Sequence, residues 1–184
     1  AAERAGAAPG GPGVGLRGRM QAGFAYMNAL TVVQASQGLC EHVLAAVAQA
    51  RARGVFIGFD GRHHSREYAR MAAATFVHRG VRVYMLPELC PTPLVAYGVK
   101  ALRCAAGVMV TASHNPKHDN GYKVYWENGC QIVPPHDENI AAAIEQHARP
   151  WGVDVDALLP AGGSELFVDA TPLVVDRYFG EVRA

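Results

Sequence analysis

Short apolar runs alternate with segments of helical spacing along this chain, and that alternation constrains its fold more than any other feature. The runs are rich in β-branched residues and short enough to be buried strands: residues 55–59, 81–86 and 105–110. The segments before and between them have helical spacing or helix-terminal residues: 27–53, 65–79 and 93–102. Parallel strands need such crossover connections. The pattern predicts a three-layer α/β/α domain with a mainly parallel sheet.

One strand is expected to run against the others. Residues 122–126 follow the third apolar run after a loop too short for a crossover, which predicts an antiparallel strand. The two-residue period places Lys123 and Tyr125 on one face and the other three residues on the opposite face. Ser65 is expected to cap the helix that follows it, and Asn120-Gly121 to let the chain reverse.

The end of the chain carries weaker signals. Residues 137–147 have helical spacing, and acidic residues at their start favour a helix N-terminus. A last helix is expected at 171–182, and 148–163 reads as loop.

Composition limits what the chain can be. With 184 residues it is long enough for one domain with its own core, and the net charge of +1 gives no reason to expect nucleic acid or an anionic membrane as partner. No apolar run approaches the ~20 residues of a membrane-spanning helix. Four scattered cysteines are interpreted as reduced thiols of a cytoplasmic protein. Residues 1–15, dominated by Ala, Gly and Pro, are expected to form a disordered leader.

The most specific local feature is the stretch Thr111-Ala112-Ser113-His114-Asn115-Pro116. It follows the apolar run 105–110, so Ser113 is expected at the carboxyl end of a strand, where α/β sheets gather their ligands. Lys123, on the returning strand, could reach the same point. An ordinary turn serine and a solvent-facing lysine are the alternative interpretations.

An ordered set of motifs extends this feature over residues 15–148. The set comprises Gly15-Leu16-Arg17-Gly18, the run 58–67 that contains Asp60-Gly61-Arg62, Pro91-Thr92-Pro93, the Ser113 stretch, and Asn120-Gly121-Tyr122-Lys123. Together they resemble the α-D-phosphohexomutase superfamily, which includes the phosphoglucomutases and phosphomannomutases. Residues 119–126, with Gln131-Ile132 and Pro135-His136-Asp137, look most similar to the phosphoglucomutase-2 and phosphopentomutase branch.

The resemblance implies roles for four residues. Ser113 would carry the phosphoryl group, and its phosphate would be a metal ligand. Lys123 would act as general base and then as general acid. Arg17 would contact the phosphoryl group, unless it is simply a solvated residue of a glycine-rich loop. His114 would hydrogen-bond phosphate or substrate, or else support the loop.

Other polar residues near these motifs are less specific. By the resemblance, Asp60 and Arg62 organise the active-site side of the domain; a local ion pair is the equal alternative. The His63-His64 pair lacks the spacing of a metal site. Lys117 and His118 are interpreted as solvated loop charges.

Members of the superfamily hold Mg²⁺ between the phosphoserine and a D-G-D loop in a second domain, and they bind the sugar and the distal phosphate in a third and a fourth. This sequence contains no D-G-D. It is therefore expected to correspond to the first domain only, over residues 16–184, with the missing C-terminal domains as its partners.

The complete enzyme is expected to interconvert 1-phosphates with the 6-phosphates of hexoses or the 5-phosphates of pentoses, using Mg²⁺ and a sugar bisphosphate activator. A glucose-1,6-bisphosphate synthase of the same branch is the alternative, although Pro116 favours the mutase. A catalytically silent binding module is another. A serine hydrolase is disfavoured because the chain has no G-x-S-x-G elbow.

Overall fold

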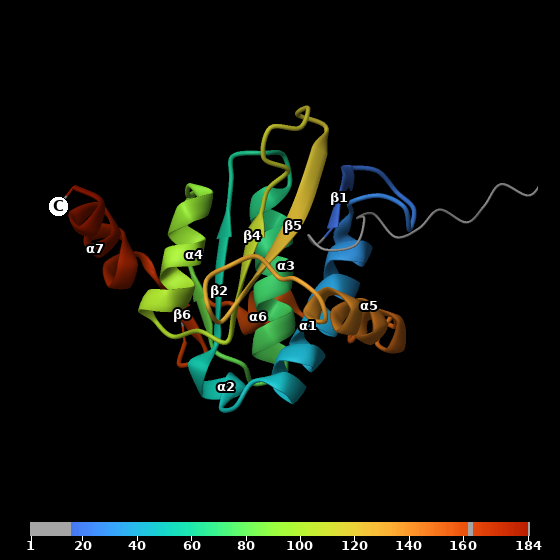
Figure 1. The fold of residues 1–184 in the computed structure, drawn as a ribbon. Helices are drawn as coiled ribbons and strands as arrows, with labels where there is room; N and C mark the ends of the chain where they lie inside the picture. The colour runs from blue at the N-terminus through green and yellow to red at the C-terminus, as the bar shows by residue number, and fades with distance from the viewer. Residues whose placement is uncertain (1–15, 162–163, 184) are drawn as a thin grey trace, which may run out of the picture.

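A six-stranded sheet organises the structure, a computed structural model that describes residues 16–161 and 164–183 (Figure 1). Its strands are β1 Leu16–Arg19, β2 Val55–Phe59, β3 Val83–Met85, β4 Ala106–Val110, β5 Asp119–Trp126 and β6 Phe167–Asp169. Their spatial order is β1-β5-β4-β2-β3-β6, and β5 is antiparallel to both of its neighbours while the other pairs are parallel. This confirms the mainly parallel sheet with one antiparallel strand. The expected leader at 1–15 lies outside the described residues.

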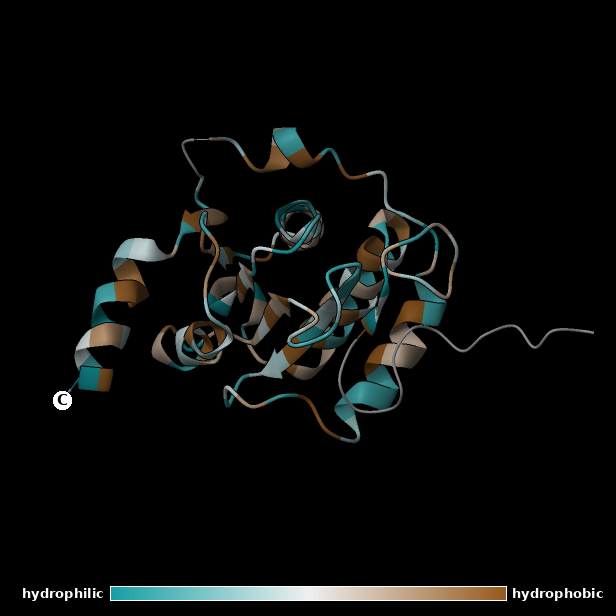
Figure 2. Cartoon of the chain, turned by 90° about the horizontal axis from the view of Figure 1, so that it is seen from above, coloured by the Kyte–Doolittle hydropathy of each residue, from teal (hydrophilic) through white to brown (hydrophobic). Residues whose placement is uncertain are grey.

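Helices cover both faces of the sheet. They are α1 Ala29–Ala46, α2 Ala50–Arg53, α3 Ser65–His78, α4 Thr92–Ala101, α5 His136–Gln146, α6 Val155–Leu158 and α7 Thr171–Arg183. α1 and α3 pack on one face, with α5 against α1 and α6 against α3, whereas α4 and α7 lie on the other. Seen from above, α6 is on the far side of α3 from the sheet, and α7 stands beyond α4 (Figure 2). The three-layer prediction is confirmed.

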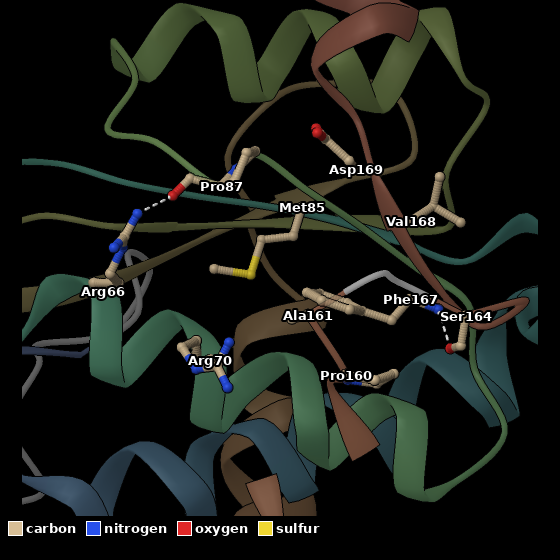
Figure 3. Close-up of a pocket in the computed structure, with 10 residues that line it drawn as sticks. All are labelled: Arg66, Arg70, Met85, Pro87, Pro160, Ala161, Ser164, Phe167, Val168 and Asp169. Carbon is tan, nitrogen blue, oxygen red and sulfur yellow. Dashed lines mark hydrogen bonds between the residues drawn. The ribbon is translucent and has the colours of Figure 1, made fainter. Parts of the chain in front are cut away.

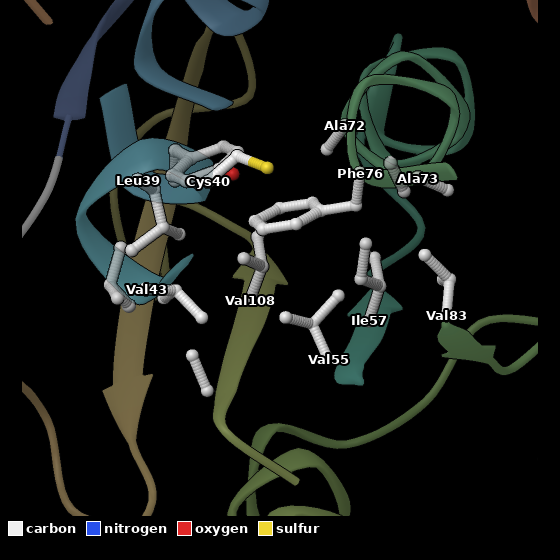
Figure 4. Packing of buried hydrophobic residues seen from close by; sticks show 14 of the residues in the cluster. Leu39, Cys40, Val43, Val55, Ile57, Ala72, Ala73, Phe76, Val83 and Val108 are labelled. Carbon is white, nitrogen blue, oxygen red and sulfur yellow. The ribbon is translucent and has the colours of Figure 1, made fainter. Parts of the chain in front are cut away.

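Each face of the sheet has its own hydrophobic core. The ring of Phe76 reaches from α3 toward Cys40 of α1 and Val108 of β4, and it is fully buried (Figure 4). Burying a side chain of this size contributes roughly 1.5–3 kcal/mol. The second core gathers Phe56 and residues of α4 and α7. Two packed layers thereby fix the sheet and the loops at its carboxyl edge.

Strand β5 shows the predicted alternation. Tyr122, Val124 and Trp126 belong to the core under α1 and α3, while Tyr125 belongs to the core under α4. Lys123 is half-buried and lies on the same side as Tyr125.

Three expectations about elements need correction. The helix predicted at 27–53 is interrupted, because Gln49 adopts a left-handed conformation (φ 56°) between α1 and α2. Residues 148–163 are not all loop, since they contain α6. Arg17 lies in a strand, β1, rather than in a glycine-rich loop.

Two local expectations are also wrong. Ser65 is the first residue of α3 and does not cap it; the N-cap is His64, which makes no side-chain cap bond. Asn120 and Gly121 lie inside β5, and the left-handed residue of the turn is Ser113 (φ 57°). Gly121 is needed for a different reason: a Cβ there would lie 2.6 Å from the carbonyl oxygen of Thr111.

The remaining composition-based expectations concern cysteines and membranes. All four cysteines are free, and three of them are buried. In the part of the chain that the structure describes, no helix has both the length and the apolar character needed to cross a bilayer.

Candidate functional site

The order of the strands creates a topological switch point between β2 and β4. From β2 the chain passes through α3 to β3 on one side, and from β3 through α4 back to β4 on the other side. β2 and β4 are adjacent and parallel, with Phe59 opposite Val110. Their carboxyl ends therefore release two loops side by side: residues 60–64, the Asp60 loop, and residues 111–118, the Ser113 loop. Open α/β sheets bind ligands at such a point.

Ser113 is exposed at the tip of this arrangement. It has φ 57°, and its N–H donates to Oγ1 of Thr111 at 2.9 Å. The N–H of Asn115 donates to the carbonyl oxygen of Ala112 at 3.1 Å, which closes the turn. A left-handed conformation costs a non-glycine residue about 1–2 kcal/mol. The fold thus presents a hydroxyl group in a strained conformation at the carboxyl edge.

Arg62 holds the Ser113 loop in place. Its guanidinium donates to four backbone carbonyl oxygens: Ser113 at 2.7 Å, Asn115 at 2.7 Å, Pro116 at 2.8 Å and Asp119 at 3.1 Å. Only 14% of the Arg62 side chain is exposed. The planar fork of five N–H donors suits this task, which a lysine could not perform.

Asp60 connects Arg62 to the rest of the fold. Its carboxylate lies 3.3 Å from Nε of Arg62 and accepts from the Arg62 N–H at 3.0 Å and from Oγ of Ser65 at 2.7 Å. Oγ of Ser65 in turn accepts from Nδ2 of Asn120 at 3.0 Å, and Asn120 is fully buried. Asp60 and Arg62 thus form the local ion pair that was one of their two interpretations. The same pair also organises this side of the domain, because it links β2, α3 and β5 to the Ser113 loop.

Arg17 and Lys123 lie on the same face of the sheet. Arg17 is opposite Gly121 and Lys123 is opposite Met109, so the two cations are diagonal neighbours, with Cα atoms about 7–8 Å apart. Gly121 lies between them and contributes no side chain, because backbone atoms of Thr111 and Leu16 occupy the space that a Cβ would need. The N–H of Thr111 donates to the carbonyl oxygen of Gly121, the residue opposite Arg17. Ser113 therefore lies two residues further along the chain than the residue level with Arg17.

Arg19 is a cation that the sequence reasoning missed. It is opposite Asp119 and exposed on the same face as Arg17. The two-residue period would have found it, had residues 16–19 been recognised as a strand.

The other predicted polar residues make few contacts. His114 is exposed, and among the described residues no hydrogen bond holds its side chain; Lys117 is also exposed. His118 lies 3.6 Å from Asp119. A hollow of about 320 Å³ lies between the Asp60 loop and the Ser113 loop, lined by Asp60, Gly61, Arg62, His63, Asn115 and Lys117.

Among the described residues, neither the buried thiol of Cys90 nor a metal cluster offers a second candidate reactive group at this edge of the sheet. Burial raises the pKa of Cys90, which follows β3, to about 11, so its thiol stays protonated. Across residues 16–161 and 164–183, no three His, Cys, Asp or Glu side chains gather as a metal site.

Comparison with known proteins identifies the family. Residues 13–150 match the family model of phosphoglucomutase/phosphomannomutase, alpha/beta/alpha domain I. Mouse phosphopentomutase is 46% identical over 166 residues, yeast (Saccharomyces cerevisiae) phosphoribomutase 50% over 140, and human glucose 1,6-bisphosphate synthase 41% over 168. These alignments cover 87%, 74% and 88% of this chain but only 26%, 22% and 26% of the relatives.

A solved structure agrees. The crystal structure of a protein from Thermus thermophilus that is described as a phosphomannomutase superposes with a TM-score of 0.72 at 25% identity, covering 92% of this chain and 34% of that one. The chain spans about a quarter of the length of its curated relatives. It belongs to the phosphoglucomutase/phosphomannomutase family and corresponds to the first, α/β/α domain of that family.

Proposed function

We propose that residues 16–184 form the phosphoserine domain of a sugar-phosphate mutase of the phosphopentomutase type. One observation carries the proposal: an exposed serine at the carboxyl end of β4 lies in a loop whose carbonyls are held by one partly buried guanidinium. Two cations, Arg17 and Lys123, lie on the adjoining face of the sheet. Relatives named phosphopentomutase and phosphoribomutase share this domain.

Ser113 would carry the phosphoryl group between two positions on a sugar. In the first half-reaction the bond from phosphorus to Oγ breaks and a bond from phosphorus to a sugar hydroxyl oxygen forms, while Nζ of Lys123 accepts the hydroxyl proton as general base. In the second half-reaction the other phosphate of the resulting bisphosphate returns to Ser113, and Lys123 gives the proton to the departing sugar oxygen. Ser113 thereby regains its phosphate.

Arg17 and His114 are proposed to bind the transferring group. The guanidinium of Arg17 can hold two phosphoryl oxygens and stabilise the negative charge that spreads over them. His114 is exposed beside the nucleophile and free to hydrogen-bond phosphate or substrate. With Lys123, they form the proposed contacts of this chain with a hexose or pentose phosphate.

Mg²⁺ and a sugar bisphosphate activator complete the proposal. The metal would neutralise charge on the phosphoryl group. Phosphorylated Ser113 is the one ligand that we assign to this chain, and the other ligands would come from elsewhere in the enzyme. The buried, unpaired thiols support a reducing compartment, so we infer a cytoplasmic enzyme.

A glucose-1,6-bisphosphate synthase is the second candidate function. The human synthase is 41% identical to this chain, close to the 46% of the mouse mutase. Both activities would use the same phosphoserine chemistry.

A domain exchange tests the proposal. Mouse phosphopentomutase, with its first domain replaced by this chain, should convert a pentose 1-phosphate into the 5-phosphate. Ser113→Ala should abolish turnover, and Lys123→Met should lower it by roughly 10²–10⁴-fold while the melting transition is kept. A folded chimera that remains active with Ser113→Ala, or that carries its phosphate on Ser65 or Thr111, would refute the assignment. Rapid formation of glucose 1,6-bisphosphate without mutase turnover would instead favour the synthase.

A further inference from the structure

A second cavity opens at the same edge of the sheet, away from Ser113 (Figure 3). Its volume is about 690 Å³, within the range of small-molecule sites. Its floor is formed by Met85, the last residue of β3, and by Phe167 and Val168 of β6, and one wall is formed by Arg66 and Arg70 of α3. Strand β2 separates β3 and β6 from β4 and the Ser113 loop. The cavity is therefore distinct from the candidate active site.

The two arginines give this cavity a cationic wall. They are four residues apart, so they share one face of α3. In Figure 3 both side chains extend from α3 toward the cavity. The Met85 thioether and the Phe167 ring lie beyond the two arginines. A ligand that fills the space would meet positive charge at one end and apolar atoms along its body.

Both arginines carry donors that an incoming anion could use. Arg66 contacts Glu88 at 3.0 Å and donates to the carbonyl oxygen of Pro87 at 2.6 Å, and Arg70 contacts Asp156 at 2.9 Å. Those carboxylates are 84% and 95% exposed, and such surface ion pairs contribute only about 0–1 kcal/mol. An anion in the cavity could replace them with charge-assisted hydrogen bonds at a less exposed position.

The opposite wall has its own charge. The carboxylate of Asp169 accepts from the N–H of Thr171 at the start of α7. It would repel an anion on that side, so the negative end of a ligand belongs next to α3 and its apolar part next to Phe167 and Val168.

We propose that this cavity binds a small anion with a compact apolar body, of the class of aryl phosphates and aryl carboxylates, through Arg66 and Arg70. The site does not depend on the function proposed for Ser113.

Methyl NMR of the 184-residue chain, labelled at its methionine methyl groups, tests the proposal. Met85 reports on the cavity, while Met109, opposite Lys123, reports on the face near the candidate active site. Phenyl phosphate or benzoate should shift the Met85 signal saturably, and phenol and inorganic phosphate should each bind about tenfold more weakly. A shift confined to Met109, no saturable shift, or equal binding of phenol would overturn the proposal.

Matched variants separate this site from general charge effects. Arg66→Gln together with Arg70→Gln should weaken the Met85 response about tenfold or more, and Arg70→Lys should weaken it less. Arg177→Gln on α7, which removes a cation outside the cavity, should leave it unchanged. Arg66→Gln alone serves if the double variant is unfolded, because more than half of that side chain is exposed. Unchanged affinity in a folded Arg66→Gln variant would count against the site.

Discussion

At the scale of single residues, Ser113 adopts a left-handed conformation that lowers stability at this position. A left-handed conformation costs a non-glycine residue about 1–2 kcal/mol, and glycine avoids this cost but loses more entropy on folding. Ser113→Gly is therefore expected to be about 0.5–1 kcal/mol more stable than Ser113→Ala. Urea unfolding of both variants measures the difference. A glycine variant less stable than the alanine variant would show that the turn is not strained.

Arg62 gives a second prediction at this scale. Arg62→Gln removes four hydrogen bonds to loop carbonyls and leaves Asp60 without its cation, so it should lower the free energy of unfolding by about 2–3 kcal/mol. Hydrogen exchange at the amides of Asn115 and Asp119 should become faster, because their turn bonds depend on this loop.

Arg66→Gln is the matched control for that variant. It removes an arginine four positions away whose ion pair is exposed, and it should cost less than about 1 kcal/mol. Equal, small effects of both substitutions would mean that Arg62 does not hold the loop.

At the scale of elements, the packing of α5 against α1 is expected to depend on pH. Nε2 of His42 on α1 lies 3.2 Å from Nδ1 of His136 on α5, and the His136 ring stacks on Trp126 with ring centroids 4.0 Å apart. Burial, and then the neighbouring His136, lower the pKa of His42 below its ordinary value of 6.5. The folded state therefore binds this proton less readily than the unfolded state does.

The sign of the effect follows from that difference. The contribution of His42 to the free energy of unfolding should be fully present above about pH 6.5. It should be lost as the pH falls from there through the lowered pKa of folded His42. In His42→Gln this loss should be smaller, so comparing urea midpoints at pH 7.5 and pH 5 in both proteins measures it. If His42→Gln loses as much stability as the parent between these two values, the histidine pair does not control the packing.

The same scale shows why some elements could be predicted and others could not. Strands β2 and β4 are buried on both faces, so their apolar runs are visible in the sequence. β1 and β6 have four and three residues at the edges of the sheet, too few to show a period. The break at Gln49 depends on the left-handed conformation of one residue. The helical spacing of apolar residues does not reveal such a conformation.

At the scale of the whole molecule, the sequence predicted the position of Ser113, and the resemblance pointed to Asp60 and Arg62 near it, but the hydrogen bonds that hold the loop were not predicted. The end of β4 follows from one apolar run, whereas the bond from Arg62 to the Ser113 carbonyl joins residues 51 positions apart. The bond from buried Asn120 to Ser65 spans 55 positions. Such contacts exist only after the sheet has formed, and periodicity within single elements carries no information about them.

The 184-residue chain by itself should show no measurable mutase turnover, even with Mg²⁺ and a sugar bisphosphate. Electrostatic catalysis of phosphoryl transfer requires the phosphate and its countercharges to be held in place together. The described residues supply an exposed serine hydroxyl and neighbouring cations, but no group of three metal-ligating side chains, and the chain spans about a quarter of its curated relatives. Ser113 should accordingly be phosphorylated only slowly by the bisphosphate. A coupled assay with glucose 1-phosphate, alongside Ser113→Ala to expose contaminating host enzyme, measures this. Robust turnover that disappears in Ser113→Ala would prove that this domain is sufficient for catalysis.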